Sequence, residues 1–196
     1  MLTHLIAFLK SINWVDVALA ALFIRVIFIS VRNGFVTEFF KFLGVICGLF
    51  ISLHYYAVTA AWAAEKTTLP LISWRFLIFV ALWAVVVLVF KFIGDGFMIL
   101  FKVQANHEGI DKYAAGFLGA GRAIFLASLS IFALLLMPHT YIRHEAGRSW
   151  GYKIAAKAAP NTYAFLHRRM IGKVFEREKF NDDVFAVVSG HGINPK

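Results

Sequence analysis

Residues 76–90 read FLIFVALWAVVVLVF, an apolar run without a single charged side chain. Together with its flanks, from Leu71 to Ile93, the run supplies the roughly 20 mostly apolar residues that an α-helix needs to cross the hydrocarbon core of a bilayer. Lys91 follows the run directly, and Asp95 follows a little later between two glycines. We therefore predict a transmembrane helix here.

The composition of the whole chain points the same way. Of its 196 residues, 60% are hydrophobic and 16% are charged. Soluble domains carry about 45–50% apolar and about 25% charged residues. This chain could not fold in water without exposing large apolar patches, so the predicted fold class is an all-α membrane protein.

Three further segments have the length and hydrophobicity of a membrane span. These predicted spans are about Trp14–Val31, Phe42–Ala64 and Ala115–Met137. Pro138 stops the last of them. The second contains Gly44-x-x-x-Gly48, a spacing of small residues that lets two helices approach closely. Residues 14–138 are thus predicted to form a four-helix transmembrane domain.

Residues 1–13 and 139–196 flank this domain. The first segment is predicted to be an interfacial leader helix, and the second a tail with helices over about Arg143–Ala159 and Thr162–Phe180, separated by Pro160. About half of the basic residues lie in the tail: Arg143, Arg148, Lys153, Lys157, Arg168, Arg169, Lys173, Arg177 and Lys179. A basic amphipathic helix is typical of a surface that binds anionic lipid headgroups. Alternatively, and with equal weight, this helix packs on its own bundle or on another subunit.

Four spans put both ends of the domain on one side of the membrane, which we call side A, and the turns near Gly34 and Gly109 on side B. Charged residues near the ends of the spans then gather toward side B: Arg25, Glu38, Lys41, Lys91, Asp95 and Arg122. Ionisable residues in spans usually pair and face the bundle interior. Lys91 and Asp95 are four residues apart, so we expect them to pair on one helix face. We favour mutual neutralisation, with a polar pathway or ligand site second and snorkelling third.

The orientation depends on how the tail is counted. Basic residues near span ends favour the cytoplasm. Without the tail, side B has the excess and would be cytoplasmic; with the tail counted fully, the assignment reverses. We favour side B inside.

Known reaction chemistry has little support in the sequence. The single cysteine, Cys47, excludes a disulfide framework, and the common metal, nucleotide and nucleophile motifs do not occur. His54 and Ser128 lie in the spans, but nothing in the sequence orders them as base and nucleophile. We predict no catalytic residue, no metal and no cofactor. We also predict that the excess of basic residues binds anionic lipid and not nucleic acid.

Two stretches carry a family resemblance. Residues 13–48, NWVDVALAALFIRVIFISVRNGFVTEFFKFLGVICG, resemble the start of the colicin V production protein (CvpA) family, with an Asp heading the first span, a glycine-led turn and a following Glu. Residues 109–129, GIDKYAAGFLGAGRAIFLASL, resemble its second signature, an Asp, spaced glycines and an Arg. The resemblance covers roughly Asn13 to Pro138. Its positions here are Asp16, Gly34, Glu38, Asp111, Gly116, Gly119 and Arg122.

The resemblance implies a multi-pass protein of the bacterial inner membrane, associated with colicin V production or secretion and with envelope integrity, and similar to no known enzyme. Elementary geometry adds roles for the motif residues. Gly34 allows the positive φ of a tight turn, and Glu38 lies in the first turn of the second span, where the helix dipole favours an anion. The Glu38 carboxylate could pair with Arg122 or with Arg25. Asp111 opens the last span in the same way, and Gly116 and Gly119 allow close packing.

Two functions remain in competition. The first is a non-enzymatic membrane protein that acts through lipid and protein contacts, as a homo-oligomer joined through its second and fourth spans or with an envelope or secretion partner. The second is an oligomeric channel or transporter component that uses the charges of side B. The candidate binding residues are Arg25, Gly34, Glu38, Asp95, Asp111, Gly116, Gly119 and Arg122.

Overall fold

The computed structural model describes residues 13–100, 109–171 and 179–190. Within these ranges the chain forms helices and no strand, which confirms the predicted fold class. The four long helices are α2 (Trp14–Asn33), α3 (Phe35–Glu65), α4 (Leu71–Leu100) and α5 (Ile110–Leu136). Each is long and apolar enough to cross a membrane. The predicted leader lies almost wholly outside the described residues.

The helices are longer than the predicted spans. α3 begins at Phe35 and not near Phe42, because Gly34 alone separates it from α2. α4 continues to Leu100 through the two glycines around Asp95, since isolated glycines weaken a helix by only about 1 kcal/mol each. Hydropathy located the apolar centre of each helix but not the polar turns at its end.

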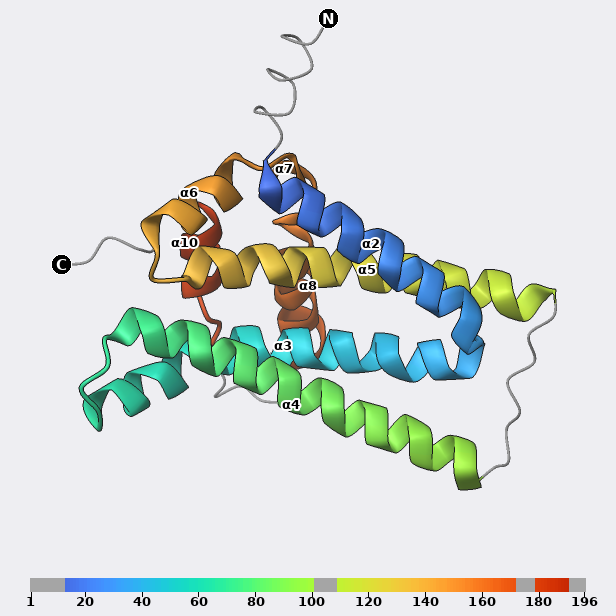
Figure 1. Cartoon of the computed structure of the whole chain (residues 1–196). Coiled ribbons are helices and arrows are strands. Elements are labelled where there is room, and N and C mark those ends of the chain that lie inside the picture. Colours follow the sequence, from blue (N-terminus) through green and yellow to red (C-terminus); the bar gives the residue numbers. More distant parts are fainter. Residues whose placement is uncertain (1–12, 101–108, 172–178, 191–196) are drawn as a thin grey trace, which may run out of the picture.

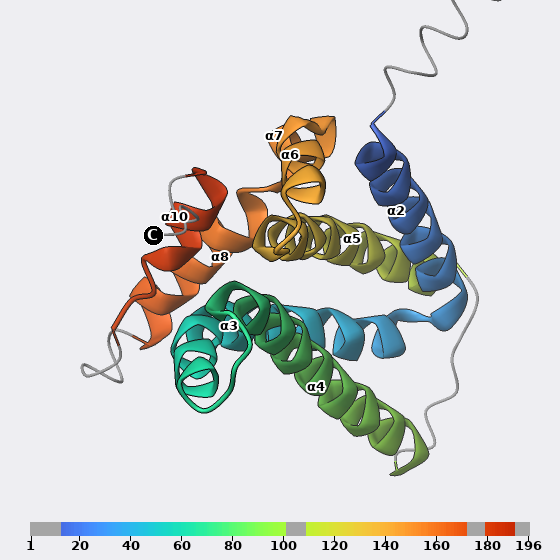
Figure 2. The same cartoon turned by 60° about the vertical axis from the view of Figure 1, so that its left-hand side comes forward.

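The four helices are arranged as two pairs. α3 packs along α4, α2 crosses α5, and contact between α3 and α5 joins the pairs, while α2 and α3 scarcely touch (Figures 1 and 2). In Figure 1, α2 begins near the top beside α7 and α5 ends at the left, while α2 ends and α3 and α5 begin at the right. The left end therefore corresponds to side A and the right end to side B.

The glycines of the second and fourth spans are used inside one chain. A Cβ on Gly44 would lie 2.7 Å from Phe90 Cβ and one on Gly48 would lie 3.1 Å from Trp83, both on α4. Gly119 of α5 meets α2 in the same way. A second copy of the chain would therefore have to use other surfaces than these glycines.

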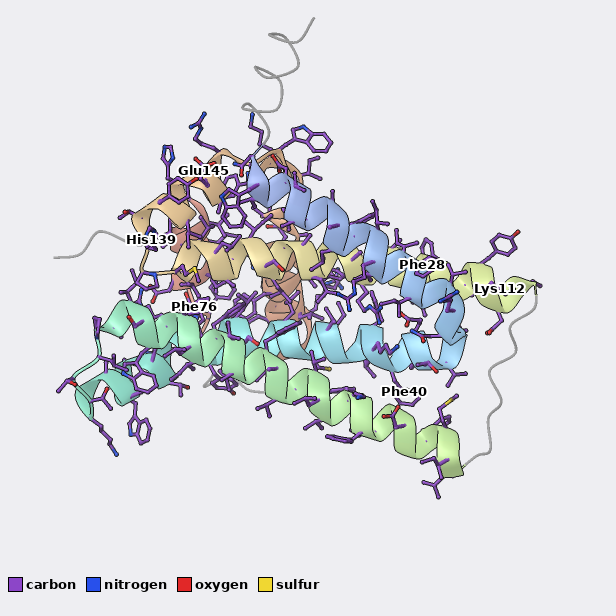
Figure 3. All side chains as sticks on the ribbon, viewed as in Figure 1. Phe28, Phe40, Phe76, Lys112, His139 and Glu145 are labelled. Carbon is purple, nitrogen blue, oxygen red and sulfur yellow. The ribbon has the colours of Figure 1, made fainter. Side chains whose placement is uncertain are left out.

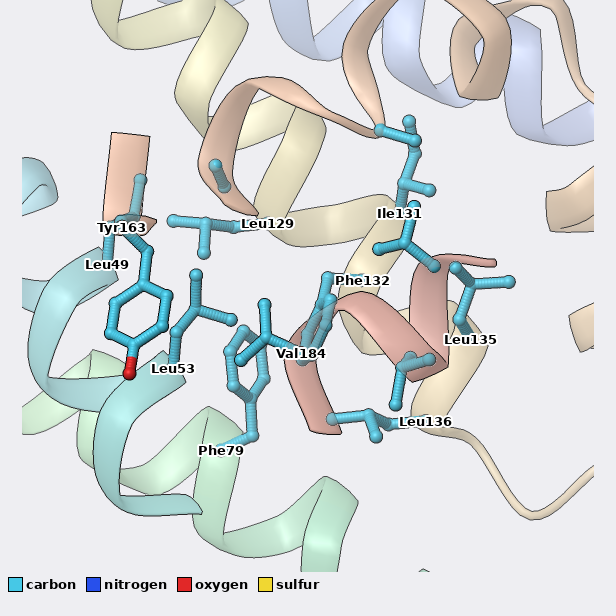
Figure 4. Packing of buried hydrophobic residues seen from close by; sticks show 14 of the residues in the cluster. Leu49, Leu53, Phe79, Leu129, Ile131, Phe132, Leu135, Leu136, Tyr163 and Val184 are labelled. Carbon is cyan, nitrogen blue, oxygen red and sulfur yellow. The ribbon is translucent and has the colours of Figure 1, made fainter. Parts of the chain in front are cut away.

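The hydrophobic core lies toward side A, where the tail closes it. Leu49, Leu53, Phe79 and Phe132 pack together with Val184 from the tail (Figure 4). The tail helices are α6 (Thr140–Arg148), α7 (Trp150–Ala155), α8 (Ala158–Leu166), which continues as a π-helical turn (His167–Ile171), and α10 (Asp183–Val188). The bundle and the described tail thus share one core.

Two predictions about the tail helices are wrong in detail. The first predicted helix is divided at Ser149, whose hydroxyl accepts from the N–H of Tyr152 and caps α7. Pro160 lies in the first turn of α8, where a missing N–H costs nothing, so it does not separate two helices. Of the two arrangements expected for the tail, α8 shows packing on its own bundle.

Polar contacts hold the tail in place. The Asn181 side chain donates to the Leu53 carbonyl at 2.7 Å, and Ser128 accepts from the N–H of Ala159 at 2.9 Å. The Asp16 carboxylate accepts from the N–H groups of Trp150 (3.0 Å) and Gly151 (2.8 Å) at the start of α7. Asp16, at the head of the first span, therefore ties this span to the tail.

We expect Asp16→Ala to release α7 and to cost about 0.5–2 kcal/mol, the range for losing a helix N-cap. Ala156 is buried beyond α7, so an Ala156→Cys probe in a Cys47→Ala background should react faster with a maleimide in Asp16→Ala. Asp95→Ala, which removes an exposed carboxylate from α4, is the matched control and should leave the rate unchanged. Equal rates in the two variants would contradict a docking role for Asp16.

Candidate functional site

The candidate site lies at the side-B end of the bundle, where α2 ends, α3 begins and α5 passes both. Gly34 connects α2 to α3 with φ 76° and ψ 161°, a backbone conformation open essentially to glycine alone. The positive φ predicted for this residue is confirmed. Because only one residue makes the turn, the first turn of α3 faces back toward the last turn of α2.

We expect Gly34→Ala to destabilise the protein by about 1–3 kcal/mol, because a Cβ is strained in this conformation. The unfolding free energy can be measured by circular dichroism during a denaturing-detergent titration in bicelles. Gly96→Ala is the control: it lies in α4 with open space around an added Cβ and should be neutral or slightly stabilising. A Gly34 variant as stable as the Gly96 variant would show that the turn relaxes freely.

Glu38 is the centre of the site and is 0% exposed. Its Oε2 lies 2.8 Å from Arg122 Nη1 of α5 and 2.9 Å from Ser30 Oγ of α2. Its Oε1 accepts from Asn33 Nδ2 at 2.8 Å and from Lys41 Nζ at 3.2 Å. Four side chains from three helices thus surround one carboxylate, which satisfies the condition for a stable buried charge.

Ser30 connects Glu38 to Arg122. Its Oγ accepts from Arg122 Nη2 at 3.2 Å and lies near two acceptors, Glu38 Oε2 and the Val26 carbonyl at 2.6 Å. A hydroxyl has one proton, so it can donate to only one of these acceptors at a time. Ser30 therefore has a partner whichever way its proton points.

Arg122 is nearly buried and is not fully satisfied. Two of its nitrogens contact Glu38 and Ser30, while Nε has no hydrogen-bond partner within the described residues. Lys41 differs, since a third of its side chain is exposed. The buried part of the site is thus a neutral Glu38–Arg122 pair, and the extra positive charge of Lys41 reaches the surface.

Asp111 has a role that the sequence did not predict. It lies in the first turn of α5, yet its Oδ1 accepts from the N–H of Phe35, the first residue of α3, at 3.1 Å. The carboxylate therefore caps a different helix as well as lying at the positive end of its own. Two of the three signature acids, Glu38 and Asp111, thus fasten α3 to its neighbours.

The eight candidate residues do not all meet. Gly34, Glu38, Asp111, Gly116, Gly119 and Arg122 come together where α2, α3 and α5 join. Arg25 is exposed on α2, and Asp95 is exposed on α4 with Lys91. Of the two expected partners for Glu38, the structure selects Arg122; the expected Lys91–Asp95 ion pair does not form. The ring of six charges is therefore reduced to Glu38, Lys41 and Arg122.

A second polar cluster lies on the side-A half of α3. His54 Nδ1 lies 2.9 Å from the hydroxyl of Tyr163 in α8, and this hydroxyl accepts from the N–H of Asn181 at 3.0 Å. Sequence reasoning gave neither His54 nor Ser128 an ordering partner. Both in fact contact the docked tail, and the only hint in the sequence was their polarity within a span.

Most of the chain matches the sequence model of a known protein family. The family model described as Colicin V production protein matches residues 15–160. The chain belongs to the colicin V production protein family. The match includes Gly34, Glu38, Asp111 and Arg122 and extends through α6 and α7 into α8, beyond the Pro138 limit of the resemblance seen in the sequence. No curated protein and no solved structure matches the chain.

Membership in the colicin V production protein family, together with four long apolar helices, makes this a membrane protein. The family is not a known family of enzymes. The matched region ends within the first turn of α8, so Tyr163 and the later described residues lie beyond it.

Proposed function

We propose that this protein is a non-enzymatic, multi-pass scaffold of the bacterial inner membrane that supports colicin V production or secretion and envelope integrity through contacts with lipids and proteins. One observation carries the proposal: Glu38 is wholly buried and held by four side chains. A carboxylate that is neutralised and shielded from solvent locks three helices together and is not itself open to a substrate or solute.

The outer surfaces suit such a scaffold. α4 and α2 are the least buried of the four long helices, and Val85 and Phe92 of α4 are more than half exposed. In the tail, Trp150 and Ile154 are exposed one turn apart, with Lys153 and Lys157 exposed beside them. We assign α4 to a protein partner or a second copy, and this face of α7 to anionic lipid headgroups.

Crosslinking in native membranes tests the scaffold. Single cysteines at Val85 or Phe92, in a Cys47→Ala background, should form crosslinks to a second copy or to a partner protein. A cysteine at Leu53, buried in the core, is the matched control and should give none. Cells that lack their own copy of the protein should also recover growth under envelope stress when the chain is supplied. Monomer alone at every exposed position would count against the scaffold.

An oligomeric channel or transporter component is the second candidate. The unpartnered Nε of Arg122 favours it, because a buried donor without a protein partner can bind water or a passing solute. Solute flux into liposomes should then fall in Glu38→Gln and Arg122→Gln variants that remain folded. Flux that these two substitutions leave unchanged would eliminate this pathway.

A further inference from the structure

An open groove of about 640 Å³ lies between α2 and α5 near side B. One wall is formed by Ile27 and Val31, one turn apart on α2. On α5, Gly116 and Ala120 are also one turn apart, and the space stays unfilled because glycine has no side chain and alanine has only a methyl group. Gly109, Lys112 and Tyr113 complete the lining at and just before the start of α5. The volume lies within the range of about 300–1,000 Å³ for small-molecule sites.

The surroundings of the groove determine what can fill it. Both walls belong to helices that are long and apolar enough to cross a membrane. The groove is open, and two of its lining residues, Val31 and Tyr113, are exposed. At that depth an apolar groove faces lipid tails and not water. A flexible acyl chain is the occupant that the lining itself selects.

The side-B end of the groove supplies a charge. Lys112 is exposed there, at the end of α5 seen on the right of Figure 3, and within the described ranges no carboxylate pairs with it. The neighbouring Asp111 carboxylate is directed to the N–H of Phe35. Tyr113 is 82% exposed, as is common for aromatic residues at the membrane–water boundary. The groove thus passes from an apolar trough to the exposed ammonium group of Lys112 at its side-B end.

We propose that the α2–α5 groove binds one anionic phospholipid, with an acyl chain along Ile27, Val31, Gly116 and Ala120 and the headgroup phosphate on Lys112. The proposal requires that the chain crosses a membrane, but it does not require the scaffold function. It also differs from lipid binding by the basic tail, because the tail contributes no residue to this groove.

The site would act on the Glu38–Arg122 junction. Val31 follows Ser30 directly, and Gly116 lies one turn before Gly119, which contacts Ser30. A lipid that fills the groove adds contacts to both helices of this crossing. Because a ligand that binds only the folded state stabilises it, anionic lipid should tighten the junction where α2 meets α5.

The experiment uses the full chain in nanodiscs with photoactivatable phosphatidylglycerol or phosphatidylcholine, and maps the labelled peptides by mass spectrometry. Phosphatidylglycerol should label residues 27–31 and 116–120 about fivefold more than phosphatidylcholine does, the factor expected for one basic residue at an anionic surface. Lys112→Gln should reduce phosphatidylglycerol labelling to the phosphatidylcholine level. Lys91→Gln, which removes an exposed lysine near the side-B end of α4, should change nothing.

Filling the groove provides the second arm. Ala120→Leu should lower labelling by both lipids, and Ile27→Phe does the same from the opposite wall if the first variant fails to fold. Elution as a single species and an unchanged helical circular dichroism spectrum establish folding. Labelling at equal density along α4, or a Lys112→Gln variant that behaves as wild type, would overturn the site, as would undiminished labelling in a folded groove-filling variant.

Discussion

Replacing Arg122 with glutamine should destabilise the bundle by about 3–5 kcal/mol, the cost of leaving a buried charge without its partner. Glu38 is 0% exposed and would keep only Ser30, Asn33 and Lys41 around its carboxylate. Unfolding free energies in bicelles, followed by circular dichroism during a denaturing-detergent titration, measure the loss. Arg122→Gln should therefore rank among the most damaging single substitutions in the chain.

The same carboxylate provides the matched control. Lys41 contacts the other oxygen of Glu38 at 3.2 Å, but a third of its side chain is exposed, so Lys41→Gln should cost less than about 1 kcal/mol. The double variant Glu38→Gln/Arg122→Gln should be less damaging than the sum of the two single variants, because it leaves no unpaired charge. Additive losses of unfolding free energy, or equal losses in Arg122→Gln and Lys41→Gln, would show that the Glu38–Arg122 pair does not hold the three helices together.

The sequence could narrow the partner of Glu38 to two arginines but could not choose between them. Arg25 and Ser30 are five residues apart on α2, which separates them by about 140° around the helix axis. Because Ser30 faces Glu38 and α5, Arg25 must face outward, and the structure shows it exposed. Hydropathy identifies a span, but a helix that is apolar nearly all round gives no sign of which face packs.

The predicted ion pair between Lys91 and Asp95 does not form, and the reason is different. An i,i+4 pair on an exposed helix face is worth only about 0.2–0.5 kcal/mol, too little to fix two side chains when both are exposed. Sequence spacing shows that two residues can meet, but not that anything holds them together. Glu38 and Arg122 are held because Gly34, Ser30 and Gly119 bring three helices together around them.

The contacts between the tail and the bundle were the feature least predictable from the sequence. Asp16 accepts from the N–H groups of Trp150 and Gly151, and Asn181 donates to Leu53, across more than half the length of the chain. Periodicity reports only local geometry, so it described the tail as amphipathic and could not say whether lipid or protein covers its apolar face. The buried Tyr163 and Val184 show that protein covers part of it.

Gly119→Ala should be nearly as damaging as loss of the buried pair, since an added Cβ would overlap the Oγ and Cβ atoms of Ser30. The Ser30 side chain cannot swing aside without leaving Glu38 and Arg122. The substitution must therefore push α2 away from α5 and stretch the polar network. Overpacking alone costs about 1–3 kcal/mol, and the strained network adds to that loss. Unfolding titrations as above measure it.

Two further variants separate this clash from a general effect of alanine. Gly116→Ala, one turn earlier on α5, places its Cβ 3.4 Å from Val31 Cγ2, an ordinary contact, and should change stability little. Ser30→Gly in the Gly119→Ala background removes the obstructing atoms and should recover much of the packing loss, though not the hydroxyl contacts to Glu38 and Arg122. If Gly116→Ala and Gly119→Ala are equally harmless, α2 and α5 do not approach as closely as the structure requires. In that case Ser30 could not bridge the acid on α3 to the base on α5.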